Sequence, residues 1–424
     1  MSARLRIGLV LGEGQHAPGG IRSVCESLSH GLARLGLEPF WLVVERVAEP
    51  GLRVVDGPSG RWPVRRVGVG PAEDLEGLAL ARTLEREAVR WSASLELDLV
   101  HAQHLAGWGL GLPAALAARG LPVMLTLHDA WSVCPRGQLW HVDGGACERA
   151  EPARCGPCVA RTWPELAGSE AEVDSWLERR EALVAGALDA CARIFTPTAS
   201  SRALLARHGA AFARVEVLPN PVRSPAGSLG PRRRVPGELR LGVLGSVQPS
   251  KGVLELARAV ERVGAPLVLE VHGPRASYHG ASRTVEDLEA LAQRTPRVEL
   301  HPAFEPEALA VRLANLDAVA VPSLWEEFHG LVAAEARLAG LPVLVSGRGG
   351  LGESGGLVVG TEEAAWEACL RELVASPARL AELTPEPPSM GSEEPVERLV
   401  QAYLEACTAR SQAASSAIAA PPQV

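Results

Sequence analysis

Short apolar runs alternate with amphipathic stretches along the first half of the chain. The run at residues 5–11 is followed by residues 20–36, whose apolar positions repeat with helical spacing. Later strand-like runs lie at 40–44, 97–102, 122–128 and 192–198. Regular alternation of strands and helices is typical of a parallel sheet covered by helices on both faces. We therefore predict a Rossmann-like, doubly wound α/β domain over residues 1–222.

A second domain is predicted after a break in this pattern. Residues 223–237, "RSPAGSLGPRRRVPG", are rich in Pro and Gly and indicate an interdomain linker. Strand-like runs then resume at 239–246, 267–273, 297–302, 316–323 and 341–347. The two halves are similar, so we predict a second Rossmann-like domain over 238–395. The two parallel sheets are expected to face a central cleft, since open α/β sheets bind ligands at the carboxyl ends of their strands.

The two ends of the chain carry different signals. The start, "MSARLRIGLVLGEG", has too short an apolar run for a secretion signal and predicts the first strand. Residues 396–408 have amphipathic spacing and predict a last helix. Residues 409–424 are rich in Ala, Ser and Pro without a packing pattern, so we predict a disordered tail.

Composition narrows the class of protein. With 424 residues and 47% hydrophobic content, the chain is long enough for two cores. The net charge of −8 and the pI near 5.8 argue against a nucleic-acid partner, which would favour a basic face. Apolar runs stay shorter than a membrane span. We therefore expect a cytoplasmic protein whose 8 cysteines are kept reduced.

Two glutamates near the end of the second domain suggest a ligand. Residues 325–340, "WEEFHGLVAAEARLAG", predict a loop containing Glu327 and a helix carrying Glu335. The start of such a helix binds anions through its backbone N–H groups. Carboxylates would repel phosphate but accept hydrogen bonds from a diol. A nucleotide-sugar satisfies both, and the small residues Ala333, Ala334 and Ala336 leave room for it. The predicted N–H donors are Phe328, His329, Gly330, Leu331 and Val332.

Four of the cysteines form a cluster in the first domain. Cys134, Cys147, Cys155 and Cys158 fall in one loop-like insertion, 134–158, with the spacing C-x12-C-x7-C-x2-C. Four thiolates suit a tetrahedral structural zinc site, which would fold a loop too polar to build its own core. Disulfides, an iron–sulfur cluster and unliganded thiols are the alternatives. A catalytic zinc is disfavoured, because four thiolates leave no open position.

Five motifs in order resemble a known family. They are "GG" after the first strand, "TLHD", "LPNPV", "GSVQPSKG" and E-x7-E. Over about residues 4–408 the chain resembles the family-four retaining glycosyltransferases of the GT-B fold. The resemblance implies a nucleotide-sugar donor and transfer with retention by front-face attack assisted by the leaving phosphate. It also implies a saccharide or lipid-linked acceptor, peripheral membrane contact in some cases, and no cofactor for catalysis.

The resemblance also implies roles for individual residues. Lys251, the only lysine in the chain, lies between a strand and a helix, where its ammonium would neutralise the donor diphosphate. His128 matches a histidine close to the transferred sugar, with Asp129 placed to orient it. Glu327 matches the residue near the reacting centre, and Glu335 matches the ribose-binding carboxylate.

Other positions complete or depart from the family pattern. Gly19 and Gly20 would turn the backbone before a helix that faces donor phosphate or acceptor, although a plain tight turn explains them equally well. After Gly245 the family has an arginine, where this chain has Ser246, which can offer a hydroxyl and a backbone N–H. The cations Arg275 and Arg348 are candidates to replace the missing charge. Phe304 is a candidate for contact with the base.

His101 and His104, in "HAQH", end another predicted strand. Two histidines at this spacing can indicate a metal site. At the end of a strand, however, their side chains would not converge on one ion, so packing or contacts with the acceptor are favoured. Two other functions stay open from the sequence. One is a sugar-nucleotide epimerase or phosphorylase on the same fold. The other is a catalytically degenerate, zinc-containing binding protein.

Overall fold

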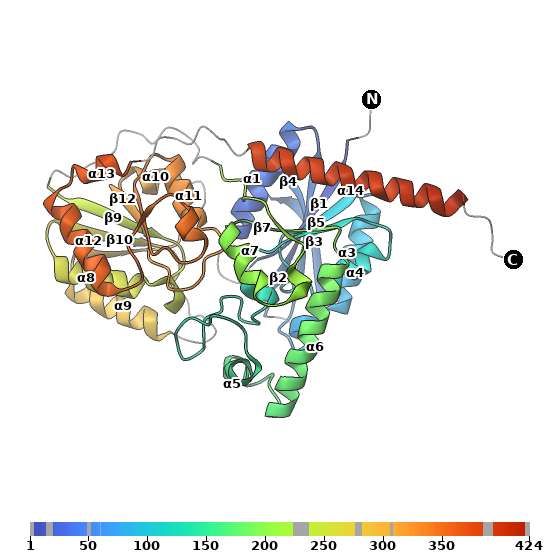
Figure 1. The fold of residues 1–424 in the computed structure, drawn as a ribbon, viewed down its shortest axis with the longest axis horizontal. Coiled ribbons are helices and arrows are strands. Elements are labelled where there is room, and N and C mark those ends of the chain that lie inside the picture. The colour runs from blue at the N-terminus through green and yellow to red at the C-terminus, as the bar shows by residue number, and fades with distance from the viewer. Residues whose placement is uncertain are drawn as a thin grey trace.

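A computed structural model describes residues 4–13, 20–48, 52–59, 61–223, 237–275, 282–305, 308–384 and 393–419. Two parallel-sheet α/β domains stand side by side (Figure 1), which confirms the predicted fold class. Most of the predicted linker, Gly19 and residues 420–424 of the predicted tail lie outside the described residues.

The N-terminal domain is built on an eight-stranded sheet of order β3-β4-β2-β1-β5-β6-β7-β8. Its strands are β1 (Arg6–Glu13), β2 (Glu38–Arg46), β3 (Leu52–Ser59), β4 (Trp62–Val69), β5 (Leu99–Ala102), β6 (Val123–Thr126), β7 (Arg193–Thr196) and β8 (Val215–Val217). Its helices include α1 (Gly20–Arg34), α2 (Glu76–Ala79), α3 (Arg82–Ser94), α4 (Leu112–Ala117), α5 (Pro152–Thr162), α6 (Glu170–Asp189) and α7 (Ala199–Ala206), with short 3₁₀ turns η1 (Ala130–Ser132) and η2 (Ala210–Phe212). The central strands are buried on both faces, as their continuous apolar runs require.

The β3–β4 hairpin at the sheet edge was not predicted. Its strand β3 pairs antiparallel with β4, and Val54 and Val55 are both exposed, at 43% and 59%. An edge strand with neither face buried leaves no period-two burial pattern to find. The antiparallel ladder with β4 holds this strand, and the cross-strand pair Asp56–Arg65, with Oδ1 and Nε 2.7 Å apart, adds to it.

The C-terminal domain has a six-stranded parallel sheet of order β11-β10-β9-β12-β13-β14. Its strands are β9 (Leu239–Leu244), β10 (Leu267–His272), β11 (Val298–His301), β12 (Ala318–Val321), β13 (Val343–Val345) and β14 (Leu357–Val358). Its helices are α8 (Val253–Val263), α9 (Arg283–Arg294), α10 (Leu309–Ala314), α11 (Leu331–Leu338), α12 (Glu363–Ala375) and α13 (Arg379–Glu382), with 3₁₀ turns η3 (Pro249–Lys251) and η5 (Gly350–Glu353). Leu256, Leu269 and Trp366 lie in its core.

The last helix corrects the predicted C-terminal boundary. Helix α14 runs over Glu393–Ala419, so residues 409–419 are helical rather than part of a disordered tail. It returns to the N-terminal domain, where Val396, Leu399 and Tyr403 are buried against the β1 and β2 side of the core. The Ala-rich continuation has high helix propensity and propagates a helix already nucleated by this packing.

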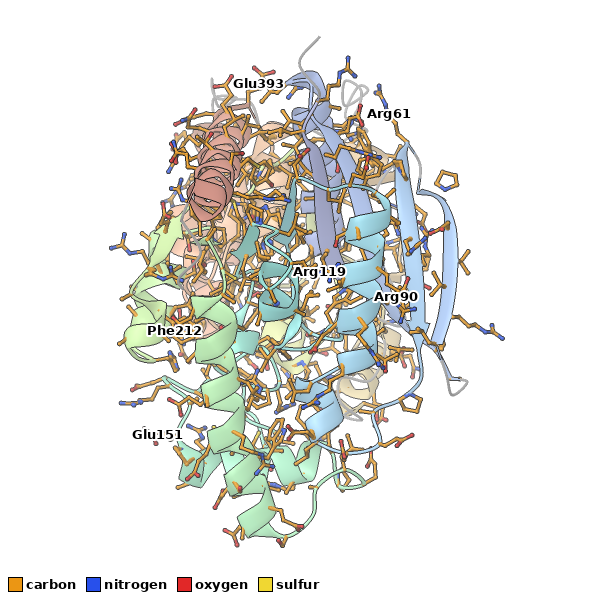
Figure 2. All side chains as sticks on the ribbon, turned by 90° about the vertical axis from the view of Figure 1, so that its right-hand side faces the viewer. Arg61, Arg90, Arg119, Glu151, Phe212 and Glu393 are labelled. Carbon is orange, nitrogen blue, oxygen red and sulfur yellow. The ribbon has the colours of Figure 1, made fainter. Side chains whose placement is uncertain are left out.

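Helix α14 and the cysteine-rich insertion lie at opposite ends of the N-terminal domain. Glu393, at the start of α14, and Glu151, just before α5, are far apart in the view from the domain's outer side (Figure 2). The insertion instead hangs below the junction of the two domains (Figure 1). None of the helices in the described part of the chain has the length and hydropathy needed to span a membrane.

Candidate active site

The loop after β9 brings Lys251 beside the end of β12. Gly252 has φ +66°, and a Cβ there would lie 2.1 Å from the carbonyl oxygen of Pro322. Only glycine permits both the left-handed backbone and this close approach. In the same loop, Gly245 has open space where a Cβ would stand, and Ser246 next to it is half-buried. The loop therefore leaves room for a ligand at 245–246 and a tight contact at 252.

Lys251 forms an ion pair with Glu327. The Lys251 Nζ donates to Glu327 Oε1 at 2.6 Å and stands 5.0 Å from the centre of the Trp325 ring. The Ser323 hydroxyl donates to the same carboxylate oxygen at 2.7 Å. Burial raises the pKa of Glu327, but the Lys251 charge and these hydrogen bonds outweigh burial and lower it. The carboxylate is thus ionised, and it orients the lone lysine.

Glycine contacts pin the backbone around Glu327. The Gly350 N–H donates to the Glu327 carbonyl at 2.6 Å, and a Cβ at Gly349 would lie 2.4 Å from that oxygen. Between these glycines and β13, Arg348 pairs with Glu326, with Nη2 and Oε1 2.9 Å apart. Arg348 therefore stands on the segment next to Glu327. The other candidate cation, Arg275, donates to the carbonyl of His301 and is held elsewhere.

Helix α11 begins where the two domains touch. Its N-cap Gly330 has φ +79°, and Leu331 is its first residue. The buried Phe328 packs into the core of the N-terminal domain, and its carbonyl accepts from Thr198 Oγ1 at 2.8 Å. The predicted donor segment from Phe328 through His329 therefore leads directly into α11, whose first two residues are Leu331 and Val332. Its orientation is set by both domains.

The small residues of α11 have a different role from the one predicted. Ala333 and Ala336 are 0% exposed and belong to the core beneath the helix, so they bring α11 close to its own sheet rather than to a ligand. Glu335, between them in sequence, points away from that core. The Ser23 hydroxyl of α1 donates to its Oε1 at 3.2 Å.

Glu335 is held in the domain interface. Burial raises its pKa to about 7, and the hydrogen bond from Ser23 only partly opposes this. Gly20, the first residue of α1, lies against the same helix, since a Cβ there would stand 2.8 Å from Leu331 Cδ1. Gly20 thus allows α1 to approach α11, and a bound diol would find Glu335 beside the start of α1.

His128 follows β6 in the N-terminal domain. Its Nε2 lies 2.9 Å from Gln103 Oε1, so the Nε2 is the protonated nitrogen that donates to this amide. Burial, with the neighbouring charges of His104 and His329, lowers the pKa of His128 to about 3. The imidazole is therefore neutral. Thr196 donates to the carbonyl of Leu127, just before His128, and Thr198 donates to that of Phe328, so His128 lies on the side of the N-terminal domain that contacts the segment before α11.

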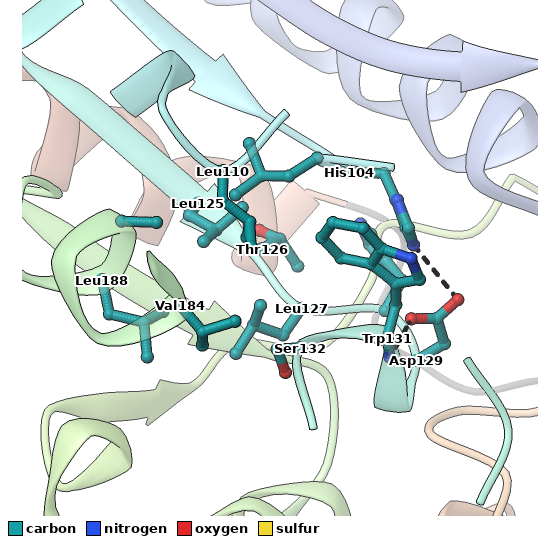
Figure 3. Close-up of a pocket in the computed structure, with 13 residues that line it drawn as sticks. His104, Leu110, Leu125, Thr126, Leu127, Asp129, Trp131, Ser132, Val184 and Leu188 are labelled. Atoms are coloured by element: carbon teal, nitrogen blue, oxygen red, sulfur yellow. Dashed lines mark hydrogen bonds and ion pairs between the residues drawn. The ribbon is translucent and has the colours of Figure 1, made fainter. Parts of the chain in front are cut away.

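Asp129 orients a different histidine from the one predicted. Its Oδ2 lies 3.1 Å from His104 Nε2, and its Oδ1 accepts from the Trp131 N–H at 2.8 Å (Figure 3). The Ala106 N–H donates to His104 Nδ1, so His104 Nε2 carries the proton given to Asp129. Gln103, which sequence reasoning missed, takes the predicted role of Asp129 toward His128. It lies in the middle of "HAQH".

The two histidines of "HAQH" separate, as expected on a strand end. His101 is 1% exposed, with Nδ1 2.7 Å from the Tyr403 hydroxyl and Nε2 2.8 Å from Thr126 Oγ1. It is a packed residue that ties α14 to the sheet. His104 instead lines the pocket in Figure 3, a space of about 20 Å³, together with Trp131.

A larger pocket opens beside His104 and was not predicted. It encloses about 330 Å³. Its lining is mostly apolar and aromatic: Gly12, Ile21, Val44, Leu78, His104, Ala106, Gly107, Trp131, Pro135, Trp163, Trp176 and Arg180. The cation among these residues, Arg180, is 4% exposed and donates to the carbonyls of Trp131 and Ser132. The pocket therefore offers ring faces and few free charges to a ligand.

The cysteine-rich insertion reaches the Lys251 loop. Gln138 donates from Nε2 to Gln248 Oε1 at 2.9 Å and accepts from the Ser250 hydroxyl at 2.7 Å. Both partners belong to the segment that ends at Lys251. The insertion therefore buttresses this loop from the N-terminal domain, a contact that no local sequence signal indicated.

The four thiols of the insertion are neighbours. Burial, together with charge on Cys134, Cys147 and Cys158, raises the pKa of Cys155 to about 11. A bound cation would reverse this and favour thiolates. The four sulfurs are not as tightly grouped as the ligand atoms of another cluster among the described residues, Glu270, His272 and His301. A zinc ion would therefore require the thiols to close around it.

A relative that spans most of the chain decides its family. The D-inositol 3-phosphate glycosyltransferase 1 of Catenulispora acidiphila is 30% identical over 394 residues, which cover 86% of this chain and 86% of that protein. The chain belongs to glycosyltransferase family 4. Family models match residues 18–224, as Glycosyltransferase Family 4, and residues 197–382, as Family 4 Glycosyltransferase in conflict systems.

Other relatives match this family 4 member over shorter stretches or by fold. The D-inositol 3-phosphate glycosyltransferase of Rhodococcus erythropolis is 36% identical over 187 residues, 40% of this chain and 42% of that protein. The match thus spans less than half of that relative's length.

Two solved structures share the GT-B fold. The catalytic domain of starch synthase IV from Arabidopsis thaliana, bound to ADP and acarbose, has a TM-score of 0.67 and 14% identity, covering 96% of this chain and 100% of that one. Anabaena HepE in complex with UDP-glucose has a TM-score of 0.60 and 16% identity, covering 97% and 100%. At these identities the likeness establishes the fold of this family 4 member and not its ligands.

Proposed function

We propose that this chain is a retaining glycosyltransferase that moves a sugar from a nucleoside diphosphate donor to an acceptor hydroxyl. The observation that carries the proposal is the ion pair of Lys251 with Glu327, placed where the carboxyl edges of the two sheets meet. His128 reaches the same junction from the N-terminal domain. A member of family 4 with these groups in one place has the parts that such a transfer needs.

Each group has a place in the proposed reaction. The diphosphate would lie over Gly245 and Ser246, with the Lys251 ammonium offsetting the charge that grows on the leaving phosphate. The ribose diol would donate to Glu335. Neutral His128 would hydrogen-bond a hydroxyl of the sugar and position it.

The transfer step would break one bond as another forms on the same face of the sugar. The acceptor oxygen bonds to the anomeric carbon while the bond from that carbon to the phosphate oxygen breaks. The acceptor proton passes to the departing phosphate, which therefore needs no separate base. Contact between the domains through Ser23 and Glu335 would exclude water and limit donor hydrolysis.

The large pocket supports a saccharide acceptor, as in polysaccharide or glycoconjugate assembly. Relatives are named as transferases acting on D-inositol 3-phosphate. In this chain, however, the pocket's cation Arg180 is already bound to two carbonyls. Trp131 and Trp163 offer aromatic faces to the apolar face of a sugar ring. A lipid-linked saccharide would present the same ring to them.

We further propose that Cys134, Cys147, Cys155 and Cys158 bind a structural zinc ion. Such an ion would cross-link a segment that is rich in Gly and Pro. Because the same segment carries Gln138, zinc would also steady the Lys251 loop. Native mass spectrometry of wild type and of a Cys155→Ser, Cys158→Ser variant tests this: we expect one zinc fewer in the variant, and equal zinc in both would contradict the proposal.

The central test is a product assay. The purified chain is incubated with UDP-, GDP- or ADP-sugars and a panel of saccharides and inositol 3-phosphate, and products are identified by mass and by anomeric coupling in NMR. We expect one donor to give a glycosylated saccharide with retained configuration. Epimerised donor, or sugar phosphate released by phosphate alone, would point to other chemistry and contradict the proposal.

A further inference from the structure

A cluster of polar side chains lies on one face of β10 and β11, at the same end of the C-terminal sheet as the Lys251 loop, where the Gly245 N–H donates to the His272 carbonyl at 2.9 Å. The register of the two parallel strands places Glu270 opposite Glu299 and His272 opposite His301. Side chains two apart on a strand point to the same face, so these four form a compact array at the carboxyl end of the strands. Arg240 joins it from β9.

The array has the spacing of metal ligands. His272 Nε2 lies 2.9 Å from Glu270 Oε2, and His301 Nε2 lies 3.8 Å from the same oxygen. The two imidazoles stack with ring centroids 4.3 Å apart. All three ligand atoms lie within 4.8 Å of one another. Zinc bonds of about 2.0–2.2 Å in a tetrahedron put ligand atoms roughly 3.3 Å apart. A metal bond lies in the plane of an imidazole, so one of the two stacked rings has to rotate for both nitrogens to reach one ion.

The charges of the array favour a cation. Arg240 is shared by three carboxylates, those of Glu238, Glu270 and Glu299, at 2.9, 2.6 and 2.8 Å. Two negative charges are left over, while Glu270 is only 5% exposed. Arg240 already compensates the buried Glu270, and the remaining charge lies on Glu238 and Glu299, whose side chains are 32% and 36% exposed. A divalent ion would offset that remaining charge.

The arrangement around Glu270 is that of a metal-binding carboxylate. Arg240 donates to Glu270 Oε1, so Oε2 is directed toward the two imidazoles. In known metal sites, a hydrogen bond to one carboxylate oxygen orients the other toward the metal in the same way. A simple hydrogen-bond network explains less. It leaves the buried His301 Nε2 without a hydrogen-bond partner in the described part of the chain.

We propose that Glu270, His272 and His301 bind a divalent transition-metal ion such as Zn²⁺. Glu299, with Oε2 3.5 Å from His301 Nε2, is placed to complete the coordination. Imidazole with carboxylate is a donor set that suits zinc over calcium or magnesium. The ion would brace the edge of β10 and β11, and its test counts bound metal rather than turnover, so failure of this site and failure of the proposed transfer can be told apart.

Metal counting on the full chain tests the site. Wild type and His301→Ala are loaded with Zn²⁺, freed of excess metal by gel filtration, and analysed by inductively coupled plasma mass spectrometry. His301 is half-buried, so its loss should leave the circular dichroism unchanged. His30→Ala, which removes an imidazole packed on Trp62, is the matched control. We expect one equivalent less zinc in His301→Ala only; equal zinc in both variants overturns the proposal.

A second measurement separates this site from the thiols. In a Cys155→Ser, Cys158→Ser variant of the full chain, added Co²⁺ should still give the ligand-field absorption of a tetrahedral nitrogen and oxygen site. Glu270→Gln in that background should weaken Co²⁺ binding by about 10- to 100-fold. Absence of the absorption, or unchanged affinity in Glu270→Gln, would refute metal binding here even if His301→Ala failed to fold.

Discussion

The two sheet edges that meet at the site differ in their electrostatics. The C-terminal domain contributes the ionised pair Lys251 and Glu327 on glycine-pinned loops. The N-terminal domain contributes neutral His128, with a pKa of about 3, and a pocket of tryptophans. The difference shows a division of roles between the domains. The C-terminal domain is suited to a charged diphosphate, and the N-terminal domain is suited to an uncharged sugar ring.

The charged edge is tested most strongly by Lys251→Ala. Removing the ammonium should lower kcat by about 10²–10³, because no other lysine can offset the leaving phosphate. Turnover at saturating donor and acceptor measures this. The matched control is Arg262→Ala, a surface cation of the same domain paired with Glu367, which should keep the wild-type rate. Wild-type turnover in Lys251→Ala would show that the Lys251 ammonium does not stabilise the leaving phosphate.

The pH dependence of nucleotide binding tests Glu335. Its pKa of about 7 means that the carboxyl is protonated below neutrality, and a ribose diol binds the ionised form. Affinity for a nucleoside diphosphate should therefore tighten as pH rises from 6 toward 8, by up to about tenfold per unit below pH 7. Without ligand, the free energy of unfolding should instead fall as pH rises toward 7. Folding raises the pKa of Glu335, so ionising this carboxyl costs stability.

Calorimetric titrations of wild type and Glu335→Gln with a nucleoside diphosphate across this pH range distinguish ionisation of Glu335 from ionisation of the nucleotide phosphates. The variant keeps the titration of the nucleotide phosphates but should lose the extra slope. The same slope in both proteins would mean that Glu335 does not contact the ligand.

The aromatic pocket is tested by Trp163→Ala. Loss of a stacking face should raise the acceptor KM by about three- to tenfold, with kcat nearly unchanged. Steady-state kinetics with varied acceptor measure it, and Trp163→Phe should restore most of the affinity. Donor hydrolysis without acceptor should match wild type. An effect on hydrolysis instead of KM would place the tryptophan on the donor side.

The smallest effect concerns the helix that returns to the N-terminal domain. Tyr403→Phe removes the hydroxyl next to His101 Nδ1 and should lower the free energy of unfolding by about 1–3 kcal/mol, because a buried partner is left unsatisfied. Chemical denaturation measures this, with kcat unaffected. Leu404→Ala, at a neighbouring position that is 45% exposed, is the control with little change. Equal stability of the two variants would show that α14 is held by apolar packing alone.

Much of the fold could be predicted because its signals are local. Buried parallel strands are continuous apolar runs, and Lys251 and Glu327 follow such runs directly, where ligands of α/β sheets bind. The exposed β3–β4 hairpin and the helical residues 409–419 had no such signal. In the first, β3 is exposed although β4 is buried at Val64 and Val67, and the second depends on a helix anchored by tertiary packing.

The sequence by itself determined the order of strands and helices, the placement of Lys251 and Glu327 in loops that follow strands, and the glycine turns in those loops. Each depends on neighbours within a few residues. Only the tertiary structure decided that Glu335 meets Ser23 and that Gln103 holds His128. It also decided that β10 and β11 bring their glutamates and histidines together. Those contacts join residues far apart in the chain, and strand register and domain packing, which place them, have no local signature in composition or spacing.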